Sequence, residues 1–185
     1  MNTFWSYFWP LVAAGLVIGA IAGAIGFRMP RALAKAKLAG DPPPPGTGRR
    51  RRLTTLAVGI LLCAGLSGLW YGPMGAAKLL THRVERDARI TLDNYEVLQV
   101  GAYLHRNPLS RRLILFGPAD DFQRSELVRI MPHIPGVREA RWSNAGGGVP
   151  LIIESIAAAI LGFLFGLSLA YLVELRRRYN SQWNW

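Results

Sequence analysis

The sequence from Ser110 to Trp142 reads SRRLILFGPADDFQRSELVRIMPHIPGVREARW, and its pattern changes twice. The apolar run 113–116 stops at a Gly-Pro pair, which is typical of a short buried strand. Pro118 suits the first turn of a helix, and Asp120-Asp121 place negative charge at the positive end of the helix dipole. Apolar residues then recur at helical spacing, namely Phe122, Leu127, Ile130, Met131 and Ile134. Pro135-Gly136 ends this helix, and residues 137–142 alternate like a half-buried strand.

The residues before this segment complete a small domain. Val84, Ala88 and Leu92 lie four apart among charged residues, so 81–94 is predicted to be an amphipathic helix. Residues 95–104 alternate partly, and they predict a strand that forms a hairpin with 111–116. The sequence therefore predicts an α+β domain of αββαβ order within residues 73–148.

Two motifs in this domain, Leu113–Gly117 and Ile134-Pro135-Gly136-Val137, resemble those of BON domains. The resemblance covers about Thr81 to Trp142, roughly a third of the chain. It implies a small bacterial αββαβ module, of a type found in the periplasm and in membrane-attached proteins. It also implies an interaction role toward phospholipid or other envelope partners, without catalytic residues. His105–Ser110 stands where the family has a glycine turn, which changes the expected register of the hairpin.

Composition indicates a membrane protein with one small water-facing part. The chain has 185 residues, is 51% hydrophobic and carries a formal net charge of +11. Its single cysteine, Cys63, lies in an apolar run, so it predicts neither a disulfide framework nor a cysteine metal cluster.

Three apolar segments are long enough to cross a bilayer: 4–27, 53–72 and 149–173. The first begins with aromatic residues, which suit a membrane interface, at Trp5, Tyr7 and Trp9. It has no preceding basic residue, so a retained helix is favoured over a cleaved signal peptide. The fold class expected is therefore a membrane α-helical protein with three transmembrane helices and a small BON-like domain.

Small residues recur every four positions in these segments and predict helix-packing faces. The glycines concerned are Gly15, Gly19, Gly23, Gly68, Gly162 and Gly166. The alternative is that glycine is simply frequent in membrane helices.

Charge distribution predicts the topology. Loop 28–52 holds eight basic residues against Asp41 alone, and the tail 174–185 holds three against Glu174. The segment 73–148 is longer and nearly balanced, with eleven basic and eight acidic residues. The positive-inside rule then places the loop and the C-terminus in the cytoplasm, and the N-terminus and the module in the periplasm of a bacterial inner membrane. The arginines at 49–52 fit a topogenic cluster better than a nucleic-acid or lipid contact, so no nucleic-acid partner is expected.

No catalytic, cofactor or metal site is expected. His82, His105 and His133 are scattered, and exposed histidines are favoured over zinc ligands. Asp120-Asp121 could bind a cation or act as an acid–base pair, but carboxylates at this place are more often helix caps. The chain carries no catalytic motif and points to no small-molecule substrate.

Two sets of charged residues remain as candidates. Glu154 is the one charge inside an apolar segment, which by default suggests a function, unless it reaches the interface near Lys78 or near the Gly-rich linker at 143–148. Arginines of the module could form a basic face for anionic lipid or cell-wall polymer, or could be salt-bridged surface residues. These are Arg111, Arg112, Arg124, Arg129 and Arg141.

The function expected is a non-enzymatic inner-membrane protein that displays a BON-like module to lipid, cell-wall or protein partners. The alternative is an accessory subunit of a larger membrane complex, which packs through its glycine-striped helices against other subunits. A transporter or channel component is the least favoured, because polar groups inside the apolar segments are few.

Overall fold

The computed structural model describes residues 3–27, 47–143 and 148–181. Most of the predicted loop 28–52, the centre of the Gly-rich linker and the last four residues of the tail lie outside this range. The chain divides into two compact units, one of Met1–Pro10 with Ser67–Ala157 and the other of Leu11–Leu66 with Ala158–Trp185.

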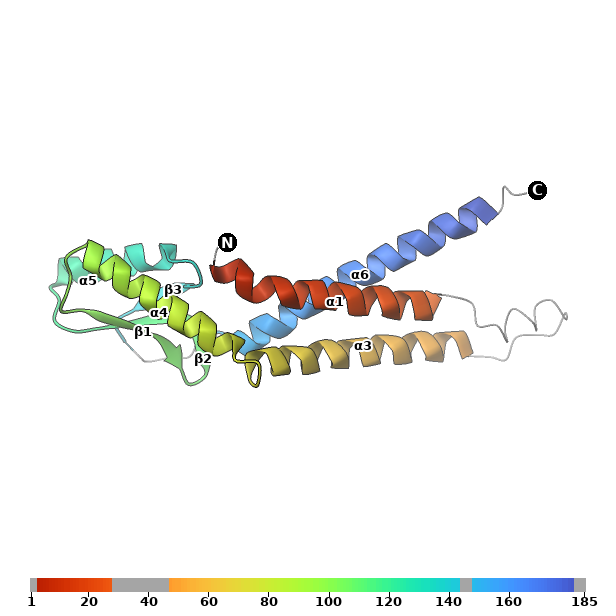
Figure 1. Ribbon diagram of the computed structural model, residues 1–185, viewed down its shortest axis with the longest axis horizontal. Helices are drawn as coiled ribbons and strands as arrows, with labels where there is room; N and C mark the ends of the chain where they lie inside the picture. The colour runs from red at the N-terminus through yellow and green to blue at the C-terminus, as the bar shows by residue number, and fades with distance from the viewer. Residues whose placement is uncertain (1–2, 28–46, 144–147, 182–185) are drawn as a thin grey trace. The chain divides into compact units, whose positions relative to one another are not determined.

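Three helices are long and apolar enough to cross a membrane, with spans at Phe4–Phe27, Arg49–Tyr71 and Leu151–Asn180. They belong to α1 (Thr3–Phe27), α3 (Thr47–Tyr71) and α6 (Leu151–Ser181) (Figure 1). The three predicted segments are confirmed as helices.

Two of these helices are longer than predicted. α3 begins at Thr47, so Arg49 to Arg52 lie in its first turns rather than ahead of it. α6 continues to Ser181, past the predicted end at residue 173, and includes Arg176, Arg177 and Arg178. Arginine is a good helix former, and Arg178 pairs with Glu174 one turn earlier at 3.1 Å. A cluster of basic residues therefore does not end either helix.

The first unit contains the small α+β domain. Its elements are α4 (Ala76–Asn94), β1 (Gly101–Arg106), β2 (Leu109–Phe116), α5 (Asp121–Ile130), a 3-10 turn η1 (Met131–His133) and β3 (Glu139–Arg141). The sheet order is β1-β2-β3, with β1 antiparallel and β3 parallel to the central β2. The αββαβ order predicted from the sequence is thus present (Figure 1).

Burial explains the strand and helix patterns. Leu113, Ile114 and Leu115 of β2 are all buried, because a central strand is covered on both faces. On α4 the predicted residues Val84, Ala88 and Leu92 are completely buried. The helix starts at Ala76, five residues before its predicted start, because the apolar period continues back through Leu80.

The turn Pro135-Gly136 needs its glycine. Gly136 has φ +106°, and a Cβ there would lie 2.7 Å from Val84 Cγ2 of α4. The turn before β3 therefore packs directly on α4, and only glycine fits this place.

Several predictions in the domain are wrong in detail. The helix predicted to end at Pro135-Gly136 ends as α5 at Ile130, and the strand predicted at 137–142 is β3, Glu139–Arg141. Residues 95–100 form turns, and β1 starts at Gly101. Pro118 precedes the helix, because Asp120 caps α5 in a capping box with Gln123. Phe122 is 75% exposed, since it lies in the first turn of α5, before the buried face begins at Leu127.

In the second unit, α1 and α6 pack at backbone distance. At four glycines, a Cβ would overlap main-chain atoms of the other helix. The contacts are Gly15 with Ala159, Gly19 with Phe163, Gly162 with Val12 and Gly166 with Leu16.

The other two predicted packing glycines differ. A Cβ at Gly23 would lie 2.5 Å from Ala170 Cβ of α6, so Gly23 extends the same contact. Gly68 on α3 has no atom of the described residues within 4 Å of such a Cβ. Five of the six glycines therefore lie where α1 and α6 meet, and no described atom lies near a Cβ at Gly68.

Candidate functional site: the Glu154 ion-pair cluster

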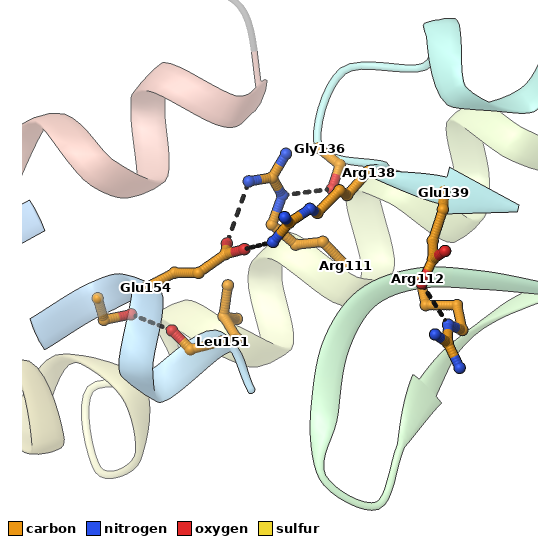
Figure 2. A network of polar contacts seen from close by, with 8 residues as sticks. Arg111, Arg112, Gly136, Arg138, Glu139, Leu151 and Glu154 are labelled. Atoms are coloured by element: carbon orange, nitrogen blue, oxygen red, sulfur yellow. Dashed lines mark hydrogen bonds and ion pairs between the residues drawn. The ribbon is translucent and has the colours of Figure 1, made fainter. Parts of the chain in front are cut away.

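Glu154, in the first turn of α6, is held by two arginines of the small domain. Arg111 Nη1 lies 3.0 Å from Oε2, and Arg138 Nη1 lies 3.4 Å from Oε1 (Figure 2). The glutamate side chain is only 16% exposed. Among the described residues, its ion-pair partners are these two arginines and not Lys78, which corrects that part of the prediction; the centre of the Gly-rich linker lies outside the described residues.

Arg111 contributes most of the contacts in this cluster. Its Nε donates to the Gly136 carbonyl oxygen at 3.1 Å (Figure 2). Its guanidinium carbon lies 4.6 Å from the centre of the Phe4 ring and 5.9 Å from that of Phe8. A cation over an aromatic face is stabilised by the ring quadrupole. Arg111 therefore connects β2 with the start of α1, the turn before β3 and the start of α6.

Local strand pairing brings the two arginines together. β2 and β3 are parallel, and the Arg138 amide donates to the Arg111 carbonyl oxygen at 2.7 Å. Glu154 also lies where the amide groups at the start of α6 favour negative charge. The cluster therefore compensates a mostly buried carboxylate with two cations and a helix dipole.

A neutral network lies one residue further along α6. The Ser155 hydroxyl is hydrogen-bonded to the Tyr7 hydroxyl at 2.9 Å, and the Ser67 hydroxyl donates to the Ser155 carbonyl oxygen at 3.3 Å. Trp70 Nε1 donates to the Tyr7 carbonyl oxygen at 3.2 Å. Buried hydroxyls are costly without partners, so these bonds join the ends of α1, α3 and α6 within the first unit. The sequence pattern did not reveal this network, because isolated serines in apolar helices carry no periodic signal.

Arg112, the neighbour of Arg111, lies in a second ion pair. Its side chain is 8% exposed, and its Nε is 2.5 Å from Glu139 Oε1 (Figure 2). Arg141 binds the other oxygen of Glu139 at 3.3 Å. The hydrogen bond from Arg112 holds the pKa of the Glu139 carboxyl below its ordinary value of 4.5, against the opposing effect of desolvation.

This pKa shift predicts a pH dependence of stability. Because the folded-state pKa is lower, the unfolded chain binds a proton first as the pH falls. The Glu139 pair therefore stabilises the fold above the unfolded-state pKa, and the contribution is lost as the pH falls through the folded-state pKa. We expect Glu139→Gln to lower the melting temperature at about pH 6 and to lower it much less at about pH 3. Thermal unfolding of the full chain in detergent measures this difference.

Glu126→Gln is the control for the loss of one carboxylate, since Glu126 pairs with the exposed Arg129 on the surface of α5. A melting-temperature difference for Glu139→Gln that stays constant over this pH range would contradict the assignment.

The remaining predicted arginines are engaged on the surface. Arg124 lies over the Trp142 ring, 5.5 Å from its centre, and Arg129 pairs with Glu126 at 2.6 Å. Since Arg111 and Arg112 are largely buried beside carboxylates, the five predicted arginines do not form one exposed basic face.

The histidines and carboxylates do not converge. His105 is buried, with Nδ1 3.0 Å from the Pro108 carbonyl oxygen, so the expectation of an exposed side chain is wrong there. His82 and His133 are exposed as expected. Asp120 caps α5, which is the structural role favoured for it. Within residues 3–27, 47–143 and 148–181, no three histidine, cysteine, aspartate or glutamate side chains are grouped to hold a metal ion.

The cluster can hold the start of α6 against β2, and its arginines pair with a carboxylate that would otherwise be buried without a partner. Glu154 has both oxygens engaged by arginine. Comparison of the chain with protein-family profiles, with curated proteins and with solved structures found no match.

Proposed function

We propose that this protein is a non-enzymatic component of the bacterial inner membrane that presents a BON-like interaction module to the periplasm. The observation that carries the proposal is the topology of the domain: α4-β1-β2-α5-β3, with a central β2 antiparallel to β1 and parallel to β3. This order agrees with the αββαβ architecture that the BON resemblance implies. The partners proposed are lipid, cell-wall polymer or protein of the envelope.

The cluster around Glu154 supports a presenting role. The ends of three apolar helices belong to the same compact unit as the module. Arg111 of the module contacts Phe4 of α1 and Glu154 of α6 directly. Ion pairs and hydrogen bonds therefore join the module to the helix ends that lie in its own unit. A flexible tether would not need these contacts.

The proposed topology is supported by where the charges lie on the helices. Arg49 to Arg52 are at the end of α3 opposite Tyr71, which lies near the module. The arginines of α6 are likewise at its far end from Glu154. These positive charges therefore lie at the helix ends that are proposed to be cytoplasmic.

Accessory-subunit function is the second candidate, and α3 favours it. Gly65 and Gly68 have no described atom within 4 Å of a Cβ, so a small-residue face of this helix is open. The packing glycines of α1 and α6, in contrast, are already used inside the chain. A partner helix would therefore be expected on α3.

Cysteine labelling tests the topology on which the function rests. With Cys63 replaced by Ala, a single cysteine at Arg124 is expected to react with an impermeant maleimide in intact spheroplasts. A cysteine at Thr47 is expected to react only after lysis. The reverse pattern would exclude a periplasmic module.

Purification in mild detergent separates the two candidates. A presenting protein is expected to purify without other membrane proteins in fixed ratio. An accessory subunit is expected to co-purify with partners in fixed ratio. Gly68→Leu is then expected to remove these partners, whereas Gly162→Ala, at a position packed inside the chain, is not expected to remove them.

A further inference from the structure

A cavity of about 400 Å³ lies at the end of α3, where the chain turns into α4. Lys78, Thr81 and His82 of α4 line it, together with Arg106 at the end of β1. Tyr71 and Leu109 supply apolar walls. All of these residues belong to the first compact unit.

The cavity is cationic. Lys78 and His82 are one turn apart, so both point to the same face of α4. Both are exposed, and the Arg106 side chain is 66% exposed. No aspartate or glutamate is among the lining residues.

One carboxylate lies near this cavity. Glu85 contacts Arg106 Nη2 at 3.4 Å, and it also accepts the Leu104 amide at 3.1 Å. A guanidinium has five N–H donors, so this one contact leaves Arg106 further donors for a ligand. The charge around the cavity stays positive, with Lys78 and Arg106 against Glu85 and with His82 as an additional donor.

The position of the cavity next to the end of the apolar span of α3 indicates the class of ligand. Tyr71 is the last residue of the apolar span Arg49–Tyr71, and Trp70 and Tyr71 are rings of the kind that lie at the bilayer surface. Lys78 and His82 follow within three turns of the span's end. Basic side chains at this level meet the phosphates of lipid headgroups, and apolar walls beside them suit the glycerol and first acyl carbons.

We propose that this cavity, formed by Lys78, His82 and Arg106, binds the phosphate of an anionic phospholipid headgroup. The inference rests on the membrane role proposed above, and it places the lipid contact away from Arg111 and Arg112. Those arginines are occupied by Glu154 and Glu139, whereas the cations of the cavity are exposed.

Native mass spectrometry of the full chain, titrated with phosphatidylglycerol in detergent, tests the proposal. The double variant Lys78→Gln/Arg106→Gln is expected to bind phosphatidylglycerol about 30-fold more weakly, which corresponds to about 1 kcal/mol for each basic residue near an anionic surface. Phosphatidylcholine with the same acyl chains is expected to bind weakly to both proteins.

The matched control is Arg86→Gln/Arg129→Gln, which removes the same charge from exposed residues outside the cavity lining. It is expected to retain wild-type binding, as is the conservative variant Lys78→Arg. Equal loss in the control and the cavity variant would overturn the proposal, because binding would then follow net charge alone. Both double variants must melt within a few degrees of wild type, and His82→Gln provides a milder cavity variant if they do not.

Inorganic phosphate distinguishes the two sources of the same chemistry. If inorganic phosphate binds while phosphatidylglycerol does not, the cavity is a site for a soluble phosphate and the lipid proposal fails. Cysteine labelling at Arg124 is independent of these outcomes, so failure of the lipid site leaves the topology, and with it the proposed function, separately decided.

Discussion

Replacing Arg111 by Met is expected to lower the free energy of unfolding by about 3 kcal/mol, because it leaves Glu154 largely buried with a single, more distant cation. Arg111 is the closer of its two arginines, at 3.0 Å against 3.4 Å for Arg138. The substitution also removes the donor to the Gly136 carbonyl and the cation from the Phe4 ring. Denaturant unfolding of the full chain in mild detergent measures the change.

A double-mutant cycle with Glu154→Gln isolates the pair itself. Once the carboxylate is neutral, loss of Arg111 no longer leaves a buried charge unpaired. The double variant is therefore expected to be more stable than the sum of the single effects predicts, by at least about 1 kcal/mol.

Arg129→Met is the control for the ion pair, since its pair with Glu126 lies on the surface with the arginine side chain 73% exposed. It is expected to cost less than about 1 kcal/mol. If Arg111→Met were no more damaging than Arg129→Met, the cluster would not be what holds the start of α6 to the domain.

Replacing Gly162 by Leu is expected to disrupt the packing of α1 against α6, at a cost of about 2–3 kcal/mol. A Cβ at this position would overlap the Val12 carbonyl oxygen, and a main-chain atom cannot rotate away as a side chain can. The helices would have to separate, which would also break the contacts at Gly15, Gly19 and Gly166. The loss of thermal stability in detergent measures the effect.

Gly65→Leu is the matched control on α3, because no described atom lies within 4 Å of a Cβ there. Leucine has a higher helix propensity than glycine, so this variant is expected to be neutral or slightly stabilising. Opposite signs for the same substitution at Gly162 and Gly65 would distinguish close packing from a general intolerance of large residues. A comparable loss at both positions would contradict the assigned packing face.

Much of the fold was predictable from local patterns. Apolar length alone predicted three helices, and the spacing of Val84, Ala88 and Leu92 predicted the buried face of α4. The Pro135-Gly136 turn was predicted from residue type, and the structure adds that Gly136 is required where it meets α4. The predicted helix ends were less accurate, because basic residues do not end a helix in which the backbone hydrogen bonds continue through them.

Other features depended on contacts distant in the sequence. The packing of α1 against α6 made use of the predicted small-residue spacing, yet nothing in that spacing indicated that α3 would leave Gly68 open. Helix propensity and periodicity describe one segment at a time, whereas a packing face is decided by the pair.

The amino-acid order by itself determined the number of apolar helices, the αββαβ order of the domain and the distribution of charge along the chain. Only the tertiary structure decided the partners of Glu154, because the chain offers 22 lysines and arginines and any of them could compensate one carboxylate. Parallel pairing of β2 with β3 brought Arg138 beside Arg111. Periodicity acts over a few residues and can be read locally, while charge compensation in a buried place depends on which distant segments the fold brings within about 4 Å.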